Sequence, residues 1–211
     1  MTKVKICGLT TAETVSACVQ AKADFIGFVA YSNSPRHCRP QQFADLAMNT
    51  GDIPTVLVTV NATDALLDDY MDVRRPDYVQ CHGGESPQRL KEIRSRNVKI
   101  IKALPIAEED DLEKISDYRD HADILLLDAK PLEGELPGGN AKSFDWSLLA
   151  NSTIESDWML SGGLTVENVN DAIAQTNAPM VDVSSGVERA PGVKDVELIE
   201  GFIHQIRHAV A

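Results

Sequence analysis

Near its N-terminus the chain reads Lys5-Ile6-Cys7-Gly8-Leu9-Thr10, a short apolar strand that runs into a cysteine and then into a glycine turn. Thr10 is followed three residues later by Glu13, a spacing typical of a helix start. Cys7 is therefore expected at the carboxyl end of the first strand. In a βα barrel, that end belongs to the face that carries the active site.

Apolar extended segments alternate with helical patterns along the rest of the chain, at roughly 25 residues per strand–helix unit. Residues 124–127, Ile-Leu-Leu-Leu, are apolar at every position, as expected of a strand covered on both faces. The expected strands are 4–7, 25–30, 54–60, 78–81, 98–104, 124–128, 158–161 and 180–184. The clearest helices are 12–22, 62–73, 87–96, 108–119, 166–175 and 194–210.

Eight parallel strands, each followed by a helical stretch, predict a (β/α)8 TIM barrel in which residues 1–211 form a single domain. The alternative is an open doubly wound sheet, which would have a Gly-x-Gly-x-x-Gly turn after its first strand. The sequence has no such turn at that place, so the barrel is favoured.

The composition argues against several classes of function. The 211 residues carry a formal net charge of −12, which argues against nucleic-acid binding. No apolar run is long enough to span a bilayer and the N-terminus lacks a secretory signal, so a cytoplasmic protein without membrane contacts is expected. A site for a small anion would have to be built locally, from backbone amides and a few basic side chains.

Polar and reactive residues gather where the expected strands end, namely at Cys7, Arg36, Gln80, His82 and Asp128. The strand ends of a barrel share one face, so these residues are expected to share one site. Gln80 and His82 have the same parity on their strand and are expected to face the pocket and contact the substrate.

Two glycine clusters follow the seventh and eighth strands. Gly162 and Gly163 precede a helix start, and Ser185 and Gly186 follow the last strand. Glycines let backbone amides approach an anion closely, and a helix N-terminus adds a favourable dipole. These four residues are therefore expected to bind phosphate, since the loops after strands seven and eight form the usual phosphate site of a barrel. The alternative is that the glycines only make tight turns.

The four cysteines form no Cys-x-x-Cys pair and are expected to be free thiols. A zinc site needs three or four converging ligands, and the parity of Cys81 differs from that of His82, so no metal is expected. Cys18 and Cys81 are expected in the core, whereas Cys38 is placed in a loop where reagents can reach it.

Seven motifs, in this order and spacing, resemble the phosphoribosylanthranilate isomerase family, and the likeness runs from about residue 4 to the C-terminus. The motifs are Lys-Ile-Cys-Gly-Leu-Thr at 5–10, Ser-Pro-Arg at 34–36, Val-Gln-Cys-His-Gly at 79–83, Leu-Leu-Asp at 126–128, Phe-Asp-Trp at 144–146, Leu-Ser-Gly-Gly-Leu at 160–164 and Val-Asp-Val-Ser-Ser-Gly-Val-Glu at 181–188.

The resemblance implies a barrel of tryptophan biosynthesis that rearranges a phosphosugar–anthranilate substrate by an Amadori reaction. It also implies that Cys7 is the general base, that Asp128 is the general acid and that Arg36 holds the anthranilate carboxylate. It implies no cofactor, and other enzymes of the pathway are candidate partners. The residues suit this chemistry, because a carboxylic acid and a thiolate in one pocket can deliver and remove protons. Lys5, on the strand face of Cys7, is a candidate for favouring the thiolate.

Two positions depart from the family pattern. The loop Gly138-Gly139-Asn140-Ala141 has alanine where the family usually has glycine, so Ala141 is expected to be strained if its φ is positive. Position 81 is Cys where the family commonly has Leu. Related barrels that rearrange histidine precursors would carry Asp in place of Cys7, and indole-glycerol-phosphate synthases would carry Lys. A phosphosugar sensor without catalysis would need neither Asp128 nor Arg36.

Overall fold

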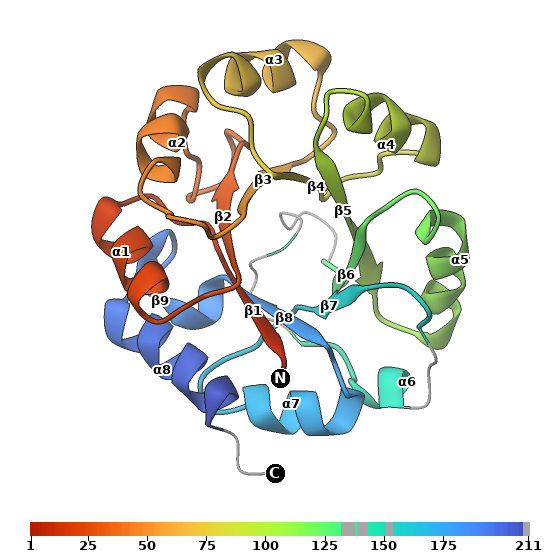
Figure 1. Ribbon diagram of the computed structural model, residues 1–211. Coiled ribbons are helices and arrows are strands. Elements are labelled where there is room, and N and C mark those ends of the chain that lie inside the picture. Colours follow the sequence, from red (N-terminus) through yellow and green to blue (C-terminus); the bar gives the residue numbers. More distant parts are fainter. Residues whose placement is uncertain (132–137, 139–142, 151–153, 209–211) are drawn as a thin grey trace.

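The computed structural model describes residues 1–131, 138, 143–150 and 154–208. Eight parallel strands close into a barrel in chain order, and helices surround it (Figure 1). The strands are β1 (Lys3–Cys7), β2 (Phe25–Val29), β3 (Thr55–Thr59), β4 (Tyr78–Cys81), β5 (Lys99–Ile106), β6 (Ile124–Ala129), β7 (Trp158–Leu160) and β8 (Met180–Val183). The helices are α1 (Ala12–Gln20), α2 (Pro40–Ala47), α3 (Asp64–Val73), α4 (Pro87–Arg94), α5 (Ile115–Tyr118), α6 (Ser147–Ala150), α7 (Val169–Thr176) and α8 (Val196–Arg207). The predicted TIM barrel is confirmed.

Alternate residues of the strands form two apolar layers. Val56, Ile101 and Leu126 belong to the cluster inside the barrel. Their strand neighbours Leu57 and Leu127 belong to the cluster between the sheet and the helices. A strand that is buried on both faces therefore reads as apolar at both parities, which explains the run at 124–127.

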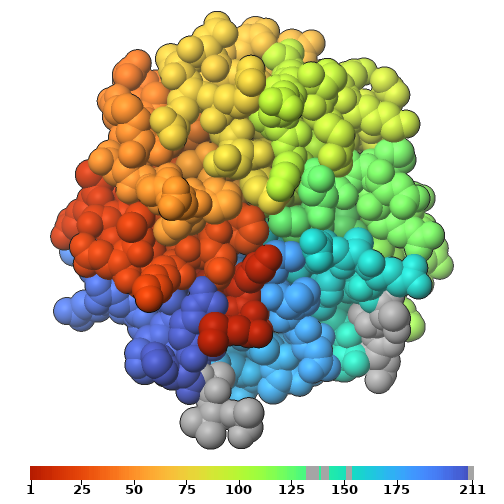
Figure 2. Space-filling view, in the orientation of Figure 1, coloured from red at the N-terminus to blue at the C-terminus, as the bar shows by residue number. Residues whose placement is uncertain are grey.

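The barrel closes between the two ends of the chain. β1 pairs with β8 from Lys3↔Met180 to Ile6↔Val183. Arg207 on α8 donates a hydrogen bond to the carbonyl of Thr2 at 2.9 Å. Figure 2 shows the N-terminal residues, in red, seated between blue C-terminal segments. Among the described residues, no helix has both the length and the apolar character needed to cross a membrane.

Several element boundaries differ from the sequence prediction. The prediction does not include α2, which begins at Pro40, whose fixed φ suits the first helical turn. The expected helix at 108–119 begins as a 3-10 helix, Glu109–Lys114, and continues as α5. A hairpin of β9 (Glu188–Ala190) and β10 (Val193–Lys194) lies where α8 was expected to begin. Helix α8 starts two residues later, because the Asp195 carboxylate accepts the Leu198 N–H at 3.2 Å and caps it.

Candidate active site

A pocket opens at the carboxyl ends of the strands. Five residues that the sequence predicts for the site line it: Cys7, Arg36, Gln80, His82 and Asp128. Its other described lining residues are Val29, Tyr31, Ser34, Val58, Val60, Gly138, Ser161, Asp182 and Ser184. The expectation that the strand ends share one site is therefore met for these side chains.

Cys7 ends β1 beside a buried ion pair. The ammonium of Lys5 lies 2.7 Å from the carboxylate of Asp182 on β8, and both side chains are nearly inaccessible. Burial raises the pKa of the Cys7 thiol, and the positive charge of Lys5 only partly offsets this effect. Lys5 thus acts on the pKa of Cys7 in the expected direction, while its ammonium also pairs with Asp182.

Gln80, His82 and Asp128 form a chain of polar contacts across the pocket wall. The side-chain nitrogen of Gln80 lies 2.9 Å from His82 Nδ1. His82 Nε2 lies 3.2 Å from Asp128 Oδ2. The predicted parity of Gln80 and His82 is confirmed, because both side chains line the pocket, whereas Cys81 between them packs in a separate core cluster with Leu90 and Ile93 of α4.

The carboxyl group of Asp128 is packed against two glycines. A Cβ at Gly138 would lie 3.2 Å from Asp128 Oδ2, and one at Gly162 would lie 3.2 Å from Oδ1. Both glycines have positive φ, of 74° and 90°. Asp128 Oδ1 also accepts the N–H of Ala129 at 2.9 Å. The backbone therefore approaches Asp128 closely on two sides, as glycine alone permits without strain.

Arg36 forms a bidentate ion pair with Glu188 of β9. Its Nε lies 2.7 Å from Glu188 Oε1 and its Nη2 lies 2.9 Å from Oε2. Lys194 of β10 donates to the same carboxylate at 2.7 Å and to the carbonyl of Ser184 at 2.8 Å. Burial alone would raise the pKa of Glu188, but Arg36 and Lys194 hold this pKa below its ordinary value. The guanidinium is thereby fixed at the pocket rim by two further charged groups.

The two glycine clusters form adjoining loops after β7 and β8. Gly162 and Gly163 both have positive φ, and their amides donate no hydrogen bond to another described residue. A Cβ at Gly186 would lie 1.8 Å from the carbonyl oxygen of Leu164, so the two loops touch there. The preceding residues Ser161 and Ser184 line the pocket. Phosphate binding by Gly162, Gly163, Ser185 and Gly186 stays a prediction.

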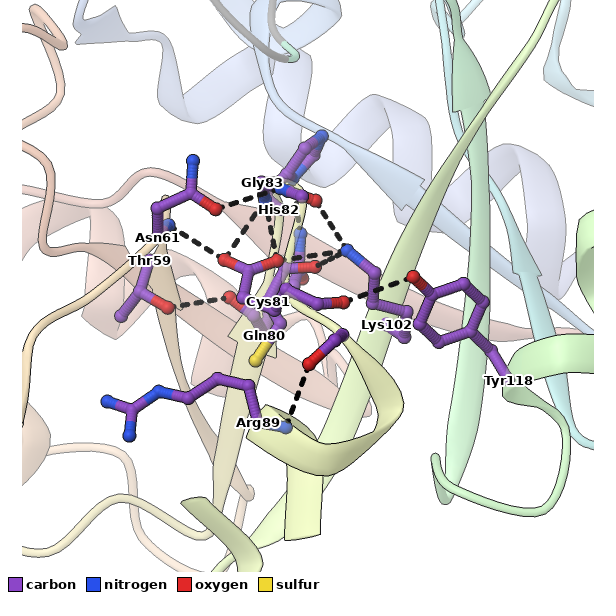
Figure 3. A network of polar contacts seen from close by, with 12 residues as sticks. Thr59, Asn61, Gln80, Cys81, His82, Gly83, Arg89, Lys102 and Tyr118 are labelled. Carbon is purple, nitrogen blue, oxygen red and sulfur yellow. Dashed lines mark hydrogen bonds and ion pairs between the residues drawn. The ribbon is translucent and has the colours of Figure 1, made fainter. Parts of the chain in front are cut away.

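A buried polar network lies behind the segment that carries His82 (Figure 3). The ammonium of Lys102 lies 2.9 Å from the Glu85 carboxylate and donates to the carbonyls of Cys81 and Gly83 at 3.2 and 2.6 Å. Glu85 accepts the N–H groups of Asn61 and Gly83 at 2.8 and 3.0 Å. The loop between β4 and α4 is therefore held from outside the barrel.

Sequence reasoning missed the charged partners of the site, Asp182, Glu188, Lys194, Glu85 and Lys102. One signal was available for some of them. Lys5, Lys102 and Asp182 each stand between two apolar neighbours in an expected strand, and a charge in such a place is rarely buried unless it is paired. The sequence does not show which charges pair, because Lys5 and Asp182 are 177 positions apart.

The predictions for the other cysteines have mixed outcomes. Cys18 and Cys81 are buried, as expected. The expectation that Cys38 is accessible is wrong, because its N–H bonds to the Val29 carbonyl, its own carbonyl accepts the Tyr70 hydroxyl, and its side chain is fully buried. Ala141 lies outside the described residues. Among the residues that are described, no group of three or more His, Cys, Asp or Glu side chains is arranged to hold a metal ion.

A closed barrel that collects a thiol, a carboxyl group, an imidazole and a guanidinium at the carboxyl ends of its strands belongs to the class of (β/α)8-barrel enzymes. The family model described as N-(5'phosphoribosyl)anthranilate (PRA) isomerase matches residues 4–205. The chain belongs to this family.

Relatives along the whole chain agree with this assignment. The N-(5'-phosphoribosyl)anthranilate isomerase of Parvibaculum lavamentivorans is 50% identical over 98% of this chain and 99% of its own length. The protein of the same name from Brucella canis is 49% identical over 99% of this chain and 95% of its own length.

Solved structures are also similar over almost the whole length of the chain. The phosphoribosyl anthranilate isomerase of Thermotoga maritima has a TM-score of 0.88 and 35% identity, with 98% of this chain and 99% of that chain covered. A phosphoribosyl anthranilate isomerase in complex with reduced 1-(o-carboxyphenylamino)-1-deoxyribulose 5-phosphate has a TM-score of 0.85 and 33% identity, with the same coverage.

Proposed function

We propose that residues 1–211 act as one catalytic domain that converts N-(5-phosphoribosyl)anthranilate into 1-(o-carboxyphenylamino)-1-deoxyribulose 5-phosphate by an Amadori rearrangement in tryptophan biosynthesis. Membership of the isomerase family supports the reaction. A single observation supports the roles of the residues, namely the convergence of Cys7, Arg36 and Asp128 on one pocket. A cytoplasmic location and contacts with other pathway enzymes stay predictions.

In this mechanism Asp128 is the general acid and Cys7 is the general base. Transfer of the Asp128 proton to the ribose ring oxygen breaks the bond from that oxygen to C1, while the nitrogen lone pair forms a C1=N bond. The Cys7 thiolate then removes the C2 proton, which gives an enolamine. The enolamine becomes the ketone when C1 gains a proton and the 2-hydroxyl loses one. A positioned acid or base typically contributes about 10²- to 10⁴-fold each.

Arg36 is the proposed partner of the anthranilate carboxylate. A planar guanidinium suits a carboxylate, because its N–H groups can form parallel hydrogen bonds. Glu188 takes the Nε edge and one side of Nη2, and this contact orients the guanidinium before the substrate arrives. The adjoining loops at Gly162–Gly163 and Ser185–Gly186 are the proposed phosphate site, where backbone amides receive the anion.

The test is a coupled assay in which phosphoribosylanthranilate is generated in situ and the loss of its anthranilate-type fluorescence is followed. The wild-type chain is expected to turn the substrate over. Asp128→Asn keeps the shape of the pocket but removes the acid, so kcat should fall by at least about 10²-fold while the substrate still binds. Absence of turnover in the wild-type protein would overturn the proposed function.

A further inference from the structure

His82 stands between two polar partners, and each contact uses a different ring nitrogen. Gln80 approaches Nδ1 at 2.9 Å and Asp128 Oδ2 approaches Nε2 at 3.2 Å. A neutral imidazole has one donor nitrogen and one acceptor nitrogen. If Gln80 donates its N–H to Nδ1 of a neutral ring, then Nε2 carries the ring proton and donates it to Asp128 Oδ2. The proton positions on the ring and on Asp128 are therefore coupled through this contact.

Gln80 is suited to two states of this chain. Its side-chain oxygen is buried and has no hydrogen-bond partner among the described residues. Rotation of the amide by half a turn would place this oxygen against Nδ1, where it would accept an N–H from the ring. Nε2 and Asp128 Oδ2 could then hold one further proton between them. An amide is both donor and acceptor. Gln80 can therefore hydrogen-bond to His82 whether or not a further proton lies between His82 Nε2 and Asp128 Oδ2.

We propose that Asp128 and His82 hold the acidic proton of the reaction jointly, and that Gln80 is a positioning residue that orients the His82 ring; this proposal rests on the proposed function. The loaded pair has one proton between Oδ2 and Nε2, with Nδ1–H donated to the Gln80 oxygen. That proton passes through Asp128 to the ribose ring oxygen as the C1–O bond breaks. The unloaded pair is the Asp128 carboxylate with neutral His82. His82 thus belongs to the proton donor, and the role of substrate ligand predicted for it is not needed.

The surroundings keep the pair in contact. A Cβ at Gly138 would come within 2.9 Å of His82 Cε1 and 3.2 Å of Asp128 Oδ2, so backbone covers the contact from the pocket side. On the other side, Lys102, which is paired with Glu85, donates to the carbonyl of Gly83 and fixes the backbone that follows His82. Figure 3 shows Lys102 beside Gly83. The side chains of His82 and Asp128 are only 13% and 8% exposed, and such low exposure strengthens a hydrogen bond between them.

Other titratable or charged groups also surround the pair. Cys7 on β1, Tyr31 and Arg36 after β2, and Asp182 on β8 line the same pocket. Lys5 lies behind Asp182, Glu188 and Lys194 lie behind Arg36, and Glu85 and Lys102 lie behind the loop after β4. Any of these can contribute to a pH profile, so the test must identify His82 itself.

The direct test is ¹⁵N NMR of the histidine rings in the ligand-free protein, with the His82 signals identified by their loss in His82→Asn. The chain has five histidines, so the spectra are simple. In Asp128→Asn the Nε2 signal of His82 should move more than the signals of the other histidine rings, because this nitrogen loses its carboxylate partner at 3.2 Å. In Gln80→Met the ring should lose its single tautomer. Unchanged His82 ring signals in Asp128→Asn would overturn the proposal.

Kinetics give a second, independent readout. His82→Asn should lower kcat by about 10²-fold or more, with little change in KM, and should move the limb of the pH–rate profile that reports the proton donor. The matched control is His204→Asn on the exposed face of α8, which should leave both constants unchanged. A rise in KM at unchanged kcat and pH profile would make His82 a substrate ligand and overturn the proposal. Failure of the proposed function would appear differently, as absence of wild-type turnover, while the NMR result would still stand.

Discussion

Single residues in this pocket are tuned by what covers them. Cys7 is the clearest case, since burial outweighs the charge of Lys5 and raises the pKa of the thiol above its ordinary value. The chemical identity of Cys7, Arg36 and Asp128 could be read from the sequence, because each stands where a strand or its loop meets the barrel face. The charged surroundings of Cys7 and Arg36 could not be read from it, because Asp182 and Glu188, which pair with Lys5 and Arg36, come from the other end of the chain.

The first prediction concerns alkylation of Cys7. Only the thiolate reacts, so inactivation by iodoacetamide should be slow at neutral pH and should still accelerate above about pH 8.5, the range of an ordinary cysteine. Modification of the Cys7 peptide, followed by mass spectrometry, should track the loss of activity, and a product analogue should protect. A rate that reaches its plateau below pH 8 would show that the thiolate is stabilised instead. Full activity after complete modification of Cys7 would remove it as the base.

A second prediction separates Arg36 from the residue that holds it. Glu188→Gln keeps the size of the side chain but loses the charge that fixes the guanidinium, so KM should rise by about tenfold while kcat changes less. Arg36→Lys should raise KM at least as much, because an ammonium cannot form the two parallel hydrogen bonds. Steady-state kinetics on the two variants provide the measurement. A Glu188→Gln enzyme with wild-type KM would contradict the positioning role.

A third prediction uses the glycine that touches Asp128. Gly162→Ala introduces a Cβ 2.8 Å from the backbone nitrogen of Ala129 at a φ of 90°, so Asp128 must shift and kcat should fall. The expected loss is about tenfold or more, since small displacements of a catalytic group are costly. Gly51→Ala is the control, because its φ is also positive and nothing lies within 4 Å of the added Cβ. A wild-type kcat in Gly162→Ala would show that catalysis does not require the close approach of Gly162 to Asp128.

The positions of some elements are fixed by charged residues that lie outside those elements. The sequence prediction locates the eight strands because their apolar runs are strong, but it omits α2, α6 and the β9–β10 hairpin. The hairpin is short, and its Pro191-Gly192 turn reads as a loop. Lys194 pairs with Glu188 within the hairpin, and Glu188 also binds Arg36 beyond it, so tertiary charge pairs fix its place. The same holds for the loop after β4, which the pair of Glu85 and Lys102 secures.

This ion pair makes the fourth prediction. Lys102→Met leaves the buried Glu85 without its countercharge, and removal of one partner of such a pair typically costs about 3–5 kcal/mol of folding free energy. Chemical unfolding at pH 7 provides the measurement, and kcat should fall as His82 loses its fixed backbone. The control is Arg119→Gln, which breaks an exposed ion pair with Glu155 at 3.5 Å; it should cost less than about 1 kcal/mol. An equal loss of folding free energy in both variants would contradict the stabilising role of the Glu85–Lys102 ion pair.

At the scale of the molecule, the closed barrel is predictable from the sequence, but the register at which its first and last strands pair is not. Eight apolar runs at regular spacing leave few other architectures, whereas the register of β1 against β8 depends on contacts between the two ends of the chain. The apolar interior also affects how the stability of the fold depends on pH. Cys18 and Cys81 are fully buried between strands and helices, and burial raises the pKa of each thiol to about 12.

The last prediction follows from this burial. The folded protein keeps the protons of Cys18 and Cys81 up to about pH 12, whereas an unfolded chain releases them near pH 9. The folded state therefore binds more protons between these values, and its stability must fall as pH rises, by about 1.4 kcal/mol per pH unit for each thiol. Urea unfolding under reducing conditions at pH 8, 9, 10 and 11 measures this slope. In Cys18→Ala the slope should be shallower by the contribution of one thiol, because Lys194, Tyr70 and the remaining groups titrate in both proteins and cancel in the difference. Parallel slopes for the wild type and Cys18→Ala would mean that the buried thiol does not hold its proton against alkali.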